Sequence, residues 1–326
     1  MKRRDTVRFI DPFTDFAFKK IFGSEPNKGL LLAFLNALFE GRKAITEVRY
    51  MNTEYYGREK GSRTVIFDIL CTGDQGELFL IEMQKIGQEY FKDRCIYYTS
   101  SLICSQVRKG DKQGWGYQLK ETYLIGLMDF SFDDTAPDRY IHDVQLVDKY
   151  SGSVFYDRLG YIFIEIPKFD KPATALDNAM DQWLYVLKHL HRMEKIPVFL
   201  RKSVFAELFK IAEMSNLSAS ERMAYDVSLK RKWDWQNSLA YAKKKAAEQG
   251  WQEGMEQGRE EGMKKGIKEG MKQGVEQGME QGMKQGMKQG VKETQRRIAR
   301  NFKAEGIPIG VIASATGLTA AEVEKL

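Results

Sequence analysis

The sequence predicts a fold of the α/β class over about residues 1–240, followed by a C-terminal extension of a different kind. Helical spacing of apolar residues opens the chain, three strand-like apolar runs follow, and helical and strand-like segments continue up to about residue 240. Helices and strands in this order are typical of α/β proteins rather than all-α proteins. Beyond that point glycine recurs at every fourth position, from Gly250 to Gly290.

Each element of the first 240 residues is predicted from its own spacing. Apolar residues three and four apart predict helices, in chain order, at Asp15–Phe22, Lys28–Phe39, about Tyr90 to Val107, Ala173–His191 and Ser203–Ser215. Short apolar runs bounded by turn residues predict strands at Val48–Met51, Thr64–Thr72, Glu77–Lys85, Thr122–Met128 and Tyr161–Ile166.

Composition excludes several classes of protein. The chain has 326 residues, 43% hydrophobic and 29% charged, with a formal net charge of +6, which supports a sizeable core and permits a polyanionic partner. No apolar run approaches the roughly 18–20 residues that span a bilayer. The start, Met1–Asp5, leads into no apolar stretch of a signal peptide. We therefore expect a cytoplasmic protein with no membrane partner.

Cysteine and histidine are too few for a metal site of their own. The three cysteines have no CxxC spacing, and two of the three histidines, His189 and His191, do not share a helix face. A metal in this protein would be held by carboxylates, which favours a hard ion such as Mg²⁺.

One predicted hairpin places two acids opposite each other. A three-residue hairpin loop prefers glycine at its last, left-handed position, and Asp74-Gln75-Gly76 meets that preference. This loop pairs Gly73 with Glu77, so Asp68 faces Glu82 at about 5 Å, with Gln84 further along the same face.

The acids lie among apolar residues, so their charges are costly. Leu70, Leu78 and Leu80 are expected on the same face as the acids, and Phe67, Ile69, Phe79, Ile81 and Met83 on the other. Two facing carboxylates on buried strands repel each other and lose hydration. A divalent metal bridging Asp68 and Glu82 offsets this, with the backbone carbonyl of Met83 as a third ligand. The alternative is a solvated acid pair, or one paired with Arg or Lys.

Asp68 followed by Glu82-x-Gln84 after a hairpin resembles the PD-(D/E)xK nuclease signature, with Gln in the position of the lysine. More narrowly, the chain resembles the recombination-promoting nuclease/putative transposase family over about residues 5–290. The matching pieces are Asp15–Gly23, Leu35–Leu38, Phe67-Asp68, Ile81–Gln84, Arg94 with Tyr97-Tyr98, Ile164–Phe169 and the glycine-periodic tail.

The resemblance implies a restriction-endonuclease-like core, with a mixed central sheet flanked by helices, and metal-dependent DNA cleavage. By position, Asp68 and Glu82 would hold Mg²⁺, or Mn²⁺ in its place, and Gln84 would orient the attacking water or the phosphate. DNA is the implied partner, and no small-molecule cofactor is expected. A lysine in the motif supplies positive charge to the transition state, which the neutral amide of Gln84 cannot do.

Other basic residues are candidates for that charge. Lys19 or Lys20 of the first predicted helix would supply it, unless both are simply solvated helix charges. Arg94 and Tyr98 are four residues apart and share a helix face, where they hold a phosphate, brace the carboxylates or have only a surface role.

The extension divides at about residue 293. Residues 241–293 contain eleven glycines at a spacing of four, usually followed by a large apolar residue such as Met255 or Ile267. Each glycine costs about 1 kcal/mol of helix stability, which favours a flexible linker. The constant phase favours a helix that associates with a second copy, glycine permitting close approach and methionine filling gaps. A period above 3.6 implies a right-handed wrap between such helices.

Residues 294–326 have a helix-turn-helix outline. A basic helix is expected at Thr294–Lys303, a second at Pro308–Ala315 and, after Gly317, a third that opens with a capping box at Thr319–Glu322. The last helix is acidic, which favours packing or protein contact over DNA reading.

The leading hypothesis is a Mg²⁺-dependent DNA endonuclease associated with recombination or mobile elements, in which the repeat makes a homo-oligomer. The alternatives are a nuclease-fold protein that binds DNA but cuts poorly, and an oligomeric scaffold in which the acid pair is incidental.

Overall fold

The computed structural model describes residues 7–55, 65–106, 118–201 and 204–326. It forms two compact units, Met1–Ser238 and Leu239–Leu326.

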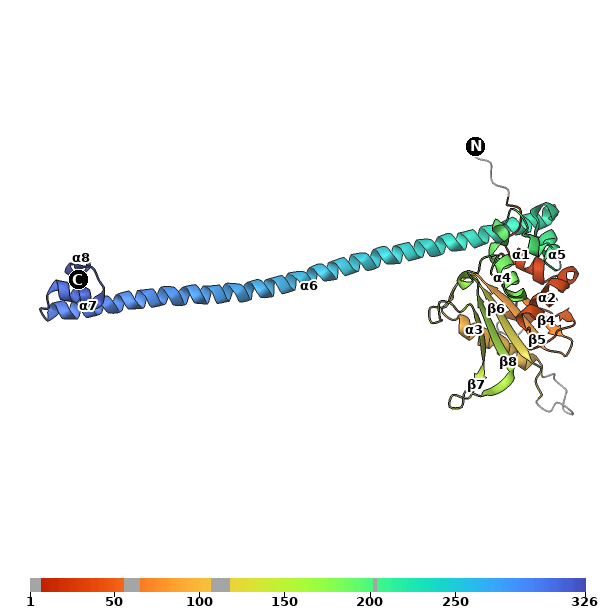
Figure 1. Cartoon of the computed structure of the whole chain (residues 1–326), viewed down its shortest axis with the longest axis horizontal. Helices are drawn as coiled ribbons and strands as arrows, with labels where there is room; N and C mark the ends of the chain where they lie inside the picture. Colours follow the sequence, from red (N-terminus) through yellow and green to blue (C-terminus); the bar gives the residue numbers. More distant parts are fainter. Residues whose placement is uncertain (1–6, 56–64, 107–117, 202–203) are drawn as a thin grey trace, which may run out of the picture. The chain divides into compact units, whose positions relative to one another are not determined.

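The first unit is built on a mixed six-stranded sheet with the strand order β1-β4-β5-β6-β8-β7 (Figure 1). These strands are β1 (Val48–Tyr50), β4 (Ile69–Gly73), β5 (Leu78–Gln84), β6 (Thr122–Met128), β8 (Val154–Glu165) and β7 (Ile141–Val147). The central strands β5, β6 and β8 are parallel, and the outer pairings β1–β4, β4–β5 and β7–β8 are antiparallel. The carboxyl ends of β5, β6 and β8 therefore meet at one edge of the sheet, and a site there can draw on all three strands.

Helices cover the two faces of this sheet unequally (Figure 1). Four helices pack on one face and share a large core with it: α1 (Asp15–Phe22), α2 (Lys28–Leu38), α4 (Ala179–His189) and α5 (Val204–Ala212). The side chain of Trp183 packs among the rings of Phe22, Phe34 and Phe205 in this core. One helix, α3 (Phe91–Ser105), covers the other face with a smaller apolar cluster.

The predicted hairpin and its register are confirmed. Strand β4 pairs with β5 from Ile69↔Ile81 to Thr72↔Leu78, and the Gly73 N–H donates to the Glu77 carbonyl at 2.9 Å. Gly76 has φ +84°, the left-handed conformation that the last position of this loop requires.

The expected strand Thr64–Thr72 is wrong as one element, and Thr64 lies outside the described residues. A bend at Phe67-Asp68 separates β4 from the short strand β3 (Val65–Ile66), which pairs instead with β2 (Glu54–Tyr55). The bend breaks the alternation of side chains. Phe67 consequently packs in the α3-side cluster with Leu70, not on the opposite face as predicted.

The remaining differences lie at edges and ends. Strand β7 was not predicted, because this exposed edge strand mixes apolar and polar residues and has neither an apolar run nor a regular alternation. Strand β8 begins earlier than the expected Tyr161. Helix α4 starts at Ala179 rather than Ala173, since the Asn178 side chain accepts the Asp181 N–H and caps the helix there.

The glycine repeat is helical. Helix α6 runs from Ala219 to Ala304, so the expected helix Thr294–Lys303 is the last part of α6 and not a separate element. After it come α7 (Ile309–Thr316) and α8 (Ala320–Glu324), which starts with the predicted capping box at Thr319. Ala299, Ile312, Leu318 and Val323 form the apolar cluster of this tail. Within the described ranges, no helix has a stretch long and apolar enough to cross a membrane.

Candidate active site

The hairpin brings Asp68 and Glu82 into contact. Glu82 lies near the end of β5, and Asp68 lies in the bend that precedes β4. The Asp68 N–H donates to Glu82 Oε1 at 3.2 Å, and the Met83 N–H donates to Asp68 Oδ2 at 2.9 Å. Each carboxylate thus accepts a backbone N–H from the segment that carries the other acid, which fixes both acids at the carboxyl end of β5.

Burial makes this acid pair electrostatically expensive. Glu82 is only 7% exposed. Burial, and then repulsion by Asp68, raises the pKa of Glu82 to about 8. Burial likewise raises the pKa of Asp68. Two ionised carboxylates at this position therefore need a positive charge close to them.

The donor set suits a hard divalent ion. Asp68 Oδ1 and Glu82 Oε2 accept no hydrogen bond from the described residues, so one oxygen of each acid is available to a cation. Met83 donates its N–H toward Asp68, and in a strand the C=O of a residue points to the same side as its N–H. That carbonyl is thus a third oxygen directed at the acids. A hard divalent ion bound here would take its remaining ligands from water and substrate phosphate.

Histidine and cysteine do not contribute to this site. In the part of the chain that the structure describes, no group of three or more His, Cys, Asp or Glu side chains could hold a metal ion. The two acids and a backbone carbonyl are therefore the protein ligands that the geometry offers.

Of the two lysines expected from α1, the structure brings Lys19 near the acids. The charge of Lys19 lowers the pKa of both Asp68 and Glu82 against the effect of burial. Its ammonium group also pairs with Asp15 at 3.0 Å, one turn earlier on the helix. Lys20 forms an ion pair with Glu221 on the first turn of α6. Lys20 therefore ties α1 to α6, and its amine is engaged away from the acid pair.

Arg94 is held beside the acids by Gln84. One Nη of Arg94 donates to Gln84 Oε1, and the other donates to Gln88 Oε1 at 2.7 Å. The guanidinium also lies over the ring of Tyr98, 5.7 Å from its centroid. Its positive charge lowers the pKa of Glu82. The spacing of Arg94 and Tyr98 on one helix face thus brings both to the acid pair.

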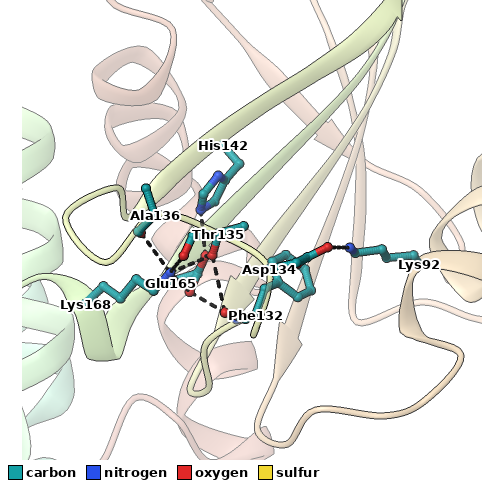
Figure 2. A network of polar contacts seen from close by, with 8 residues as sticks. All are labelled: Lys92, Phe132, Asp134, Thr135, Ala136, His142, Glu165 and Lys168. Carbon is teal, nitrogen blue, oxygen red and sulfur yellow. Dashed lines mark hydrogen bonds and ion pairs between the residues drawn. The ribbon is translucent and has the colours of Figure 1, made fainter.

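A second carboxylate lies at the carboxyl end of β8, the next strand but one, and Figure 2 shows its contacts. Glu165 is fully buried; it accepts from the Phe132 N–H at 3.1 Å and from Thr135 Oγ1 at 2.7 Å. Lys168 and His142 pair with it at 3.0 and 2.6 Å. Burial raises the pKa of Glu165, but the hydrogen bonds outweigh burial and the net shift is downward.

This network is structural. It fastens the segment after β6 to the end of β8, because Lys168 also donates to the Ala136 carbonyl at 3.0 Å. The Ile164–Phe169 stretch was singled out only through the family resemblance. The sequence analysis identified neither the ion pair of Glu165 with Lys168 nor the partner His142.

A third charged cluster follows β6. Lys232 of α6 contacts Asp11 at 2.8 Å and Asp129 at 3.3 Å, and its side chain is 10% exposed. The Asp129 N–H donates to the Gln84 carbonyl at 2.9 Å. Sequence reasoning missed this cluster, because its members come from three distant parts of the chain.

The acid pair and the adjoining amide of Gln84 lie at the end of a central strand of the mixed sheet. Residues 12–242 match the model of the PD-(D/E)XK nuclease family transposases, and the chain belongs to that family. PD-(D/E)XK nucleases generally use divalent metal ions, and DNA is the substrate that membership suggests. No curated protein and no solved structure matches the chain significantly.

Proposed function

We propose that this protein is a Mg²⁺-dependent DNA endonuclease that acts in recombination or on mobile elements. The observation that carries the proposal is the acid pair: a buried and a partly buried carboxylate, each with one oxygen that accepts no hydrogen bond from the described residues, beside a backbone carbonyl. Such a set of hard oxygen ligands accepts Mg²⁺, and Mn²⁺ has similar ligand preferences.

A divalent ion held by Asp68 and Glu82 would polarise the scissile phosphodiester and lower the pKa of the attacking water. The residues of the chain do the rest. Asp68 and Glu82 hold the ion in place, and Arg94 supplies the positive charge that the motif normally takes from a lysine. Gln84 fixes Arg94 through its Oε1 and keeps it against Glu82. Lys19 adds a second positive charge on the α1 side.

The test is cleavage of a supercoiled plasmid in Mg²⁺, with Asp68→Asn and Glu82→Gln as the variants. Both substitutions preserve size and remove one ligand charge, and both should abolish nicking. Asp74→Asn is the matched control. Asp74 is an exposed residue in the turn of the same hairpin, and it accepts a hydrogen bond from the Thr46 N–H away from the acids. Nicking by either acid variant at the wild-type rate would overturn the proposal. If the wild-type protein binds DNA but does not cleave it in Mg²⁺ or Mn²⁺, the proposal that it is an active endonuclease is wrong.

We also propose that the glycine repeat joins two copies of the chain. A Cβ built at any repeat glycine from Gly250 to Gly290 meets nothing within 4 Å, so no contact within the chain requires glycine there. The residues that follow the glycines are exposed along α6, including Met263, Met271 and Met279 at 68%, 69% and 75%. A second helix lying on this face explains both features. Two nuclease units on one duplex would suit a double-strand cut.

A further inference from the structure

We infer that a cleft at the same edge of the sheet as the acid pair but on its opposite face, lined by His191, Arg192, Lys232 and Trp233, binds an unpaired DNA strand next to the cut. In this inference the basic groups bind a backbone phosphate and Trp233 stacks on a base. The inference rests on the proposed nuclease function and specifies which form of DNA the site receives. The cavity has a volume of about 520 Å³.

The cleft begins one strand away from the catalytic residues. Gln84 of β5 pairs with Met128 of β6, and both side chains lie on the α3 face. The next residue, Asp129, points to the opposite face, where it contacts Lys232 and lines the cleft. Because the Asp129 N–H donates to the Gln84 carbonyl at 2.9 Å, the wall of the cleft and the catalytic strand are joined directly. A strand cut at Asp68 and Glu82 reaches the cleft by crossing this sheet edge.

The charge of the cleft favours an anion. Lys188, Arg192 and Lys232 line it, against the two carboxylates of Asp11 and Asp129. Lys232 contacts both acids, and the three cations together exceed the two carboxylates by one positive charge. Arg192 forms no ion pair with a carboxylate among the described residues, so its guanidinium is free to bind a phosphate bidentately.

His191 adds a hydrogen-bond donor that has no partner. Arg192 Nε donates to His191 Nε2 at 3.0 Å, and since arginine can only donate, Nε2 must be the acceptor nitrogen. The proton of the neutral imidazole is therefore on Nδ1, which is buried and has no hydrogen-bond partner in the described part of the chain. A buried donor without a partner costs free energy, and the imidazole that carries this donor lines the cleft.

Trp233 provides the second half of the site. Its side chain lines the cleft and is 55% exposed, although tryptophan is usually well buried. A base stacks on such a ring only when it is unpaired, and stacking of this kind is insensitive to base identity. The combination of cations with an exposed indole is that of a single-strand binding groove, whereas a free phosphate ion would make no use of the indole.

The test measures DNA binding, not cleavage. Full-length protein carrying Asp68→Asn is titrated into labelled single-stranded and duplex DNA, with fluorescence anisotropy as the readout. Trp233→Ala should weaken single-strand binding about ten-fold, and Trp233→Phe should restore part of it. The control is Trp235→Ala, an equally exposed tryptophan at 63% that does not line the cleft.

Binding of a backbone phosphate by Arg192 is tested with a separate variant. Arg192→Gln should lower the slope of log affinity against log salt by about 0.7, the value for one lost phosphate contact on a single strand. Arg201→Gln, an exposed arginine outside the cleft, should leave the slope unchanged. Inorganic phosphate at millimolar concentration should compete only weakly; full competition would assign the site to free phosphate and overturn the inference.

Two results separate this inference from the proposed function. If the wild-type protein nicks plasmid but Trp233→Ala and Trp235→Ala bind single strands equally well, the cleft is not the strand site and the nuclease proposal stands. If the wild-type protein neither binds nor cuts DNA, both proposals are wrong. Circular dichroism of each variant shows whether it has folded.

Discussion

Gln84 accepts a hydrogen bond from Arg94, a residue ten positions later on a different element. This contact bears on the replacement of the motif lysine by Gln84. The neutral amide carries no charge itself, but it holds a guanidinium against Glu82, whose pKa the guanidinium lowers. In the proposed site, the positive charge of the motif is therefore carried by α3 instead of β5.

This relationship predicts that Arg94 and Gln84 act as one unit. Arg94→Gln and Gln84→Ala should each slow plasmid cleavage about 10²-fold, the scale of one lost electrostatic or positioning donor. Gln84→Lys should keep or raise activity, because its ammonium group brings the charge to the strand directly. In the Gln84→Lys background, Arg94→Gln should then cost less than about ten-fold, a coupling that a double-mutant cycle measures.

Lys92→Gln is the control for this cycle. Lys92 lies on the same helix two residues before Arg94 and pairs with Asp134 at 2.9 Å, away from the acids. Its loss should leave cleavage unchanged. Strictly additive effects of the Gln84 and Arg94 substitutions would contradict the assignment of the motif charge to Arg94.

The raised pKa of Glu82 predicts pH-dependent metal binding. With a pKa of about 8 in the metal-free protein, Glu82 is mostly protonated at pH 7 and must release that proton to bind a cation. Apparent Mg²⁺ affinity should rise about ten-fold per pH unit below pH 8 and level off above it. Titration calorimetry in buffers of different ionisation enthalpy counts the released protons, and a count of zero at pH 7 would contradict the prediction.

The same pKa predicts a loss of stability with rising pH. The folded pKa of about 8 lies above the ordinary value of 4.5, so the folded protein retains a proton that the unfolded chain releases in that window. The free energy of unfolding of the metal-free protein should therefore fall as pH rises from about 4.5 to about 8. Asp68→Asn should reduce this fall, because it removes the repulsion that helps raise the pKa. Urea unfolding at pH 5, 6.5 and 8 measures the effect, and Asp74→Asn is the control.

How far the sequence predicts the site depends on whether its contacts are local. The facing of Asp68 and Glu82 was predictable, because one turn with Gly76 at its left-handed position sets the register of every pair in the hairpin. The bend at Phe67-Asp68 was not predicted, since Asp68 is followed at once by further strand-forming residues and no glycine or proline marks a break. The bend arises because β3 pairs with β2 instead of continuing β4.

Contacts between distant elements were beyond prediction. The spacing of Arg94 and Tyr98 placed them on one helix face, but only the packing of α3 over the sheet brings that face to Gln84. The partner of Lys20, Glu221, lies 201 residues away, and no local pattern distinguishes Lys20 from Lys19. Strand β7 escaped detection for a similar reason, because its partner β8 and not its own composition makes it a strand.

The last prediction concerns the glycines of α6. Replacing Gly266, Gly270, Gly274 and Gly278 by alanine causes no clash within the chain, since nothing lies within 4 Å of the added Cβ atoms. Each substitution should stabilise the helix by about 1 kcal/mol, so thermal loss of helical circular dichroism should shift upward. If two helices approach closely along this row, the same four methyl groups keep them apart, and sedimentation should show weaker self-association than in the wild type.

A helix that functions alone predicts a different pair of results: higher helicity and an unchanged mass. The matched control replaces Gln273, Gln277 and Gln281 by alanine, which changes helix propensity little and leaves the glycine row intact. This control should associate like the wild type. If the wild-type protein and the glycine variant both sediment as monomers at every concentration, the proposed self-association is wrong. The glycines of α6 would then lie on a single helix, and no contact would explain them.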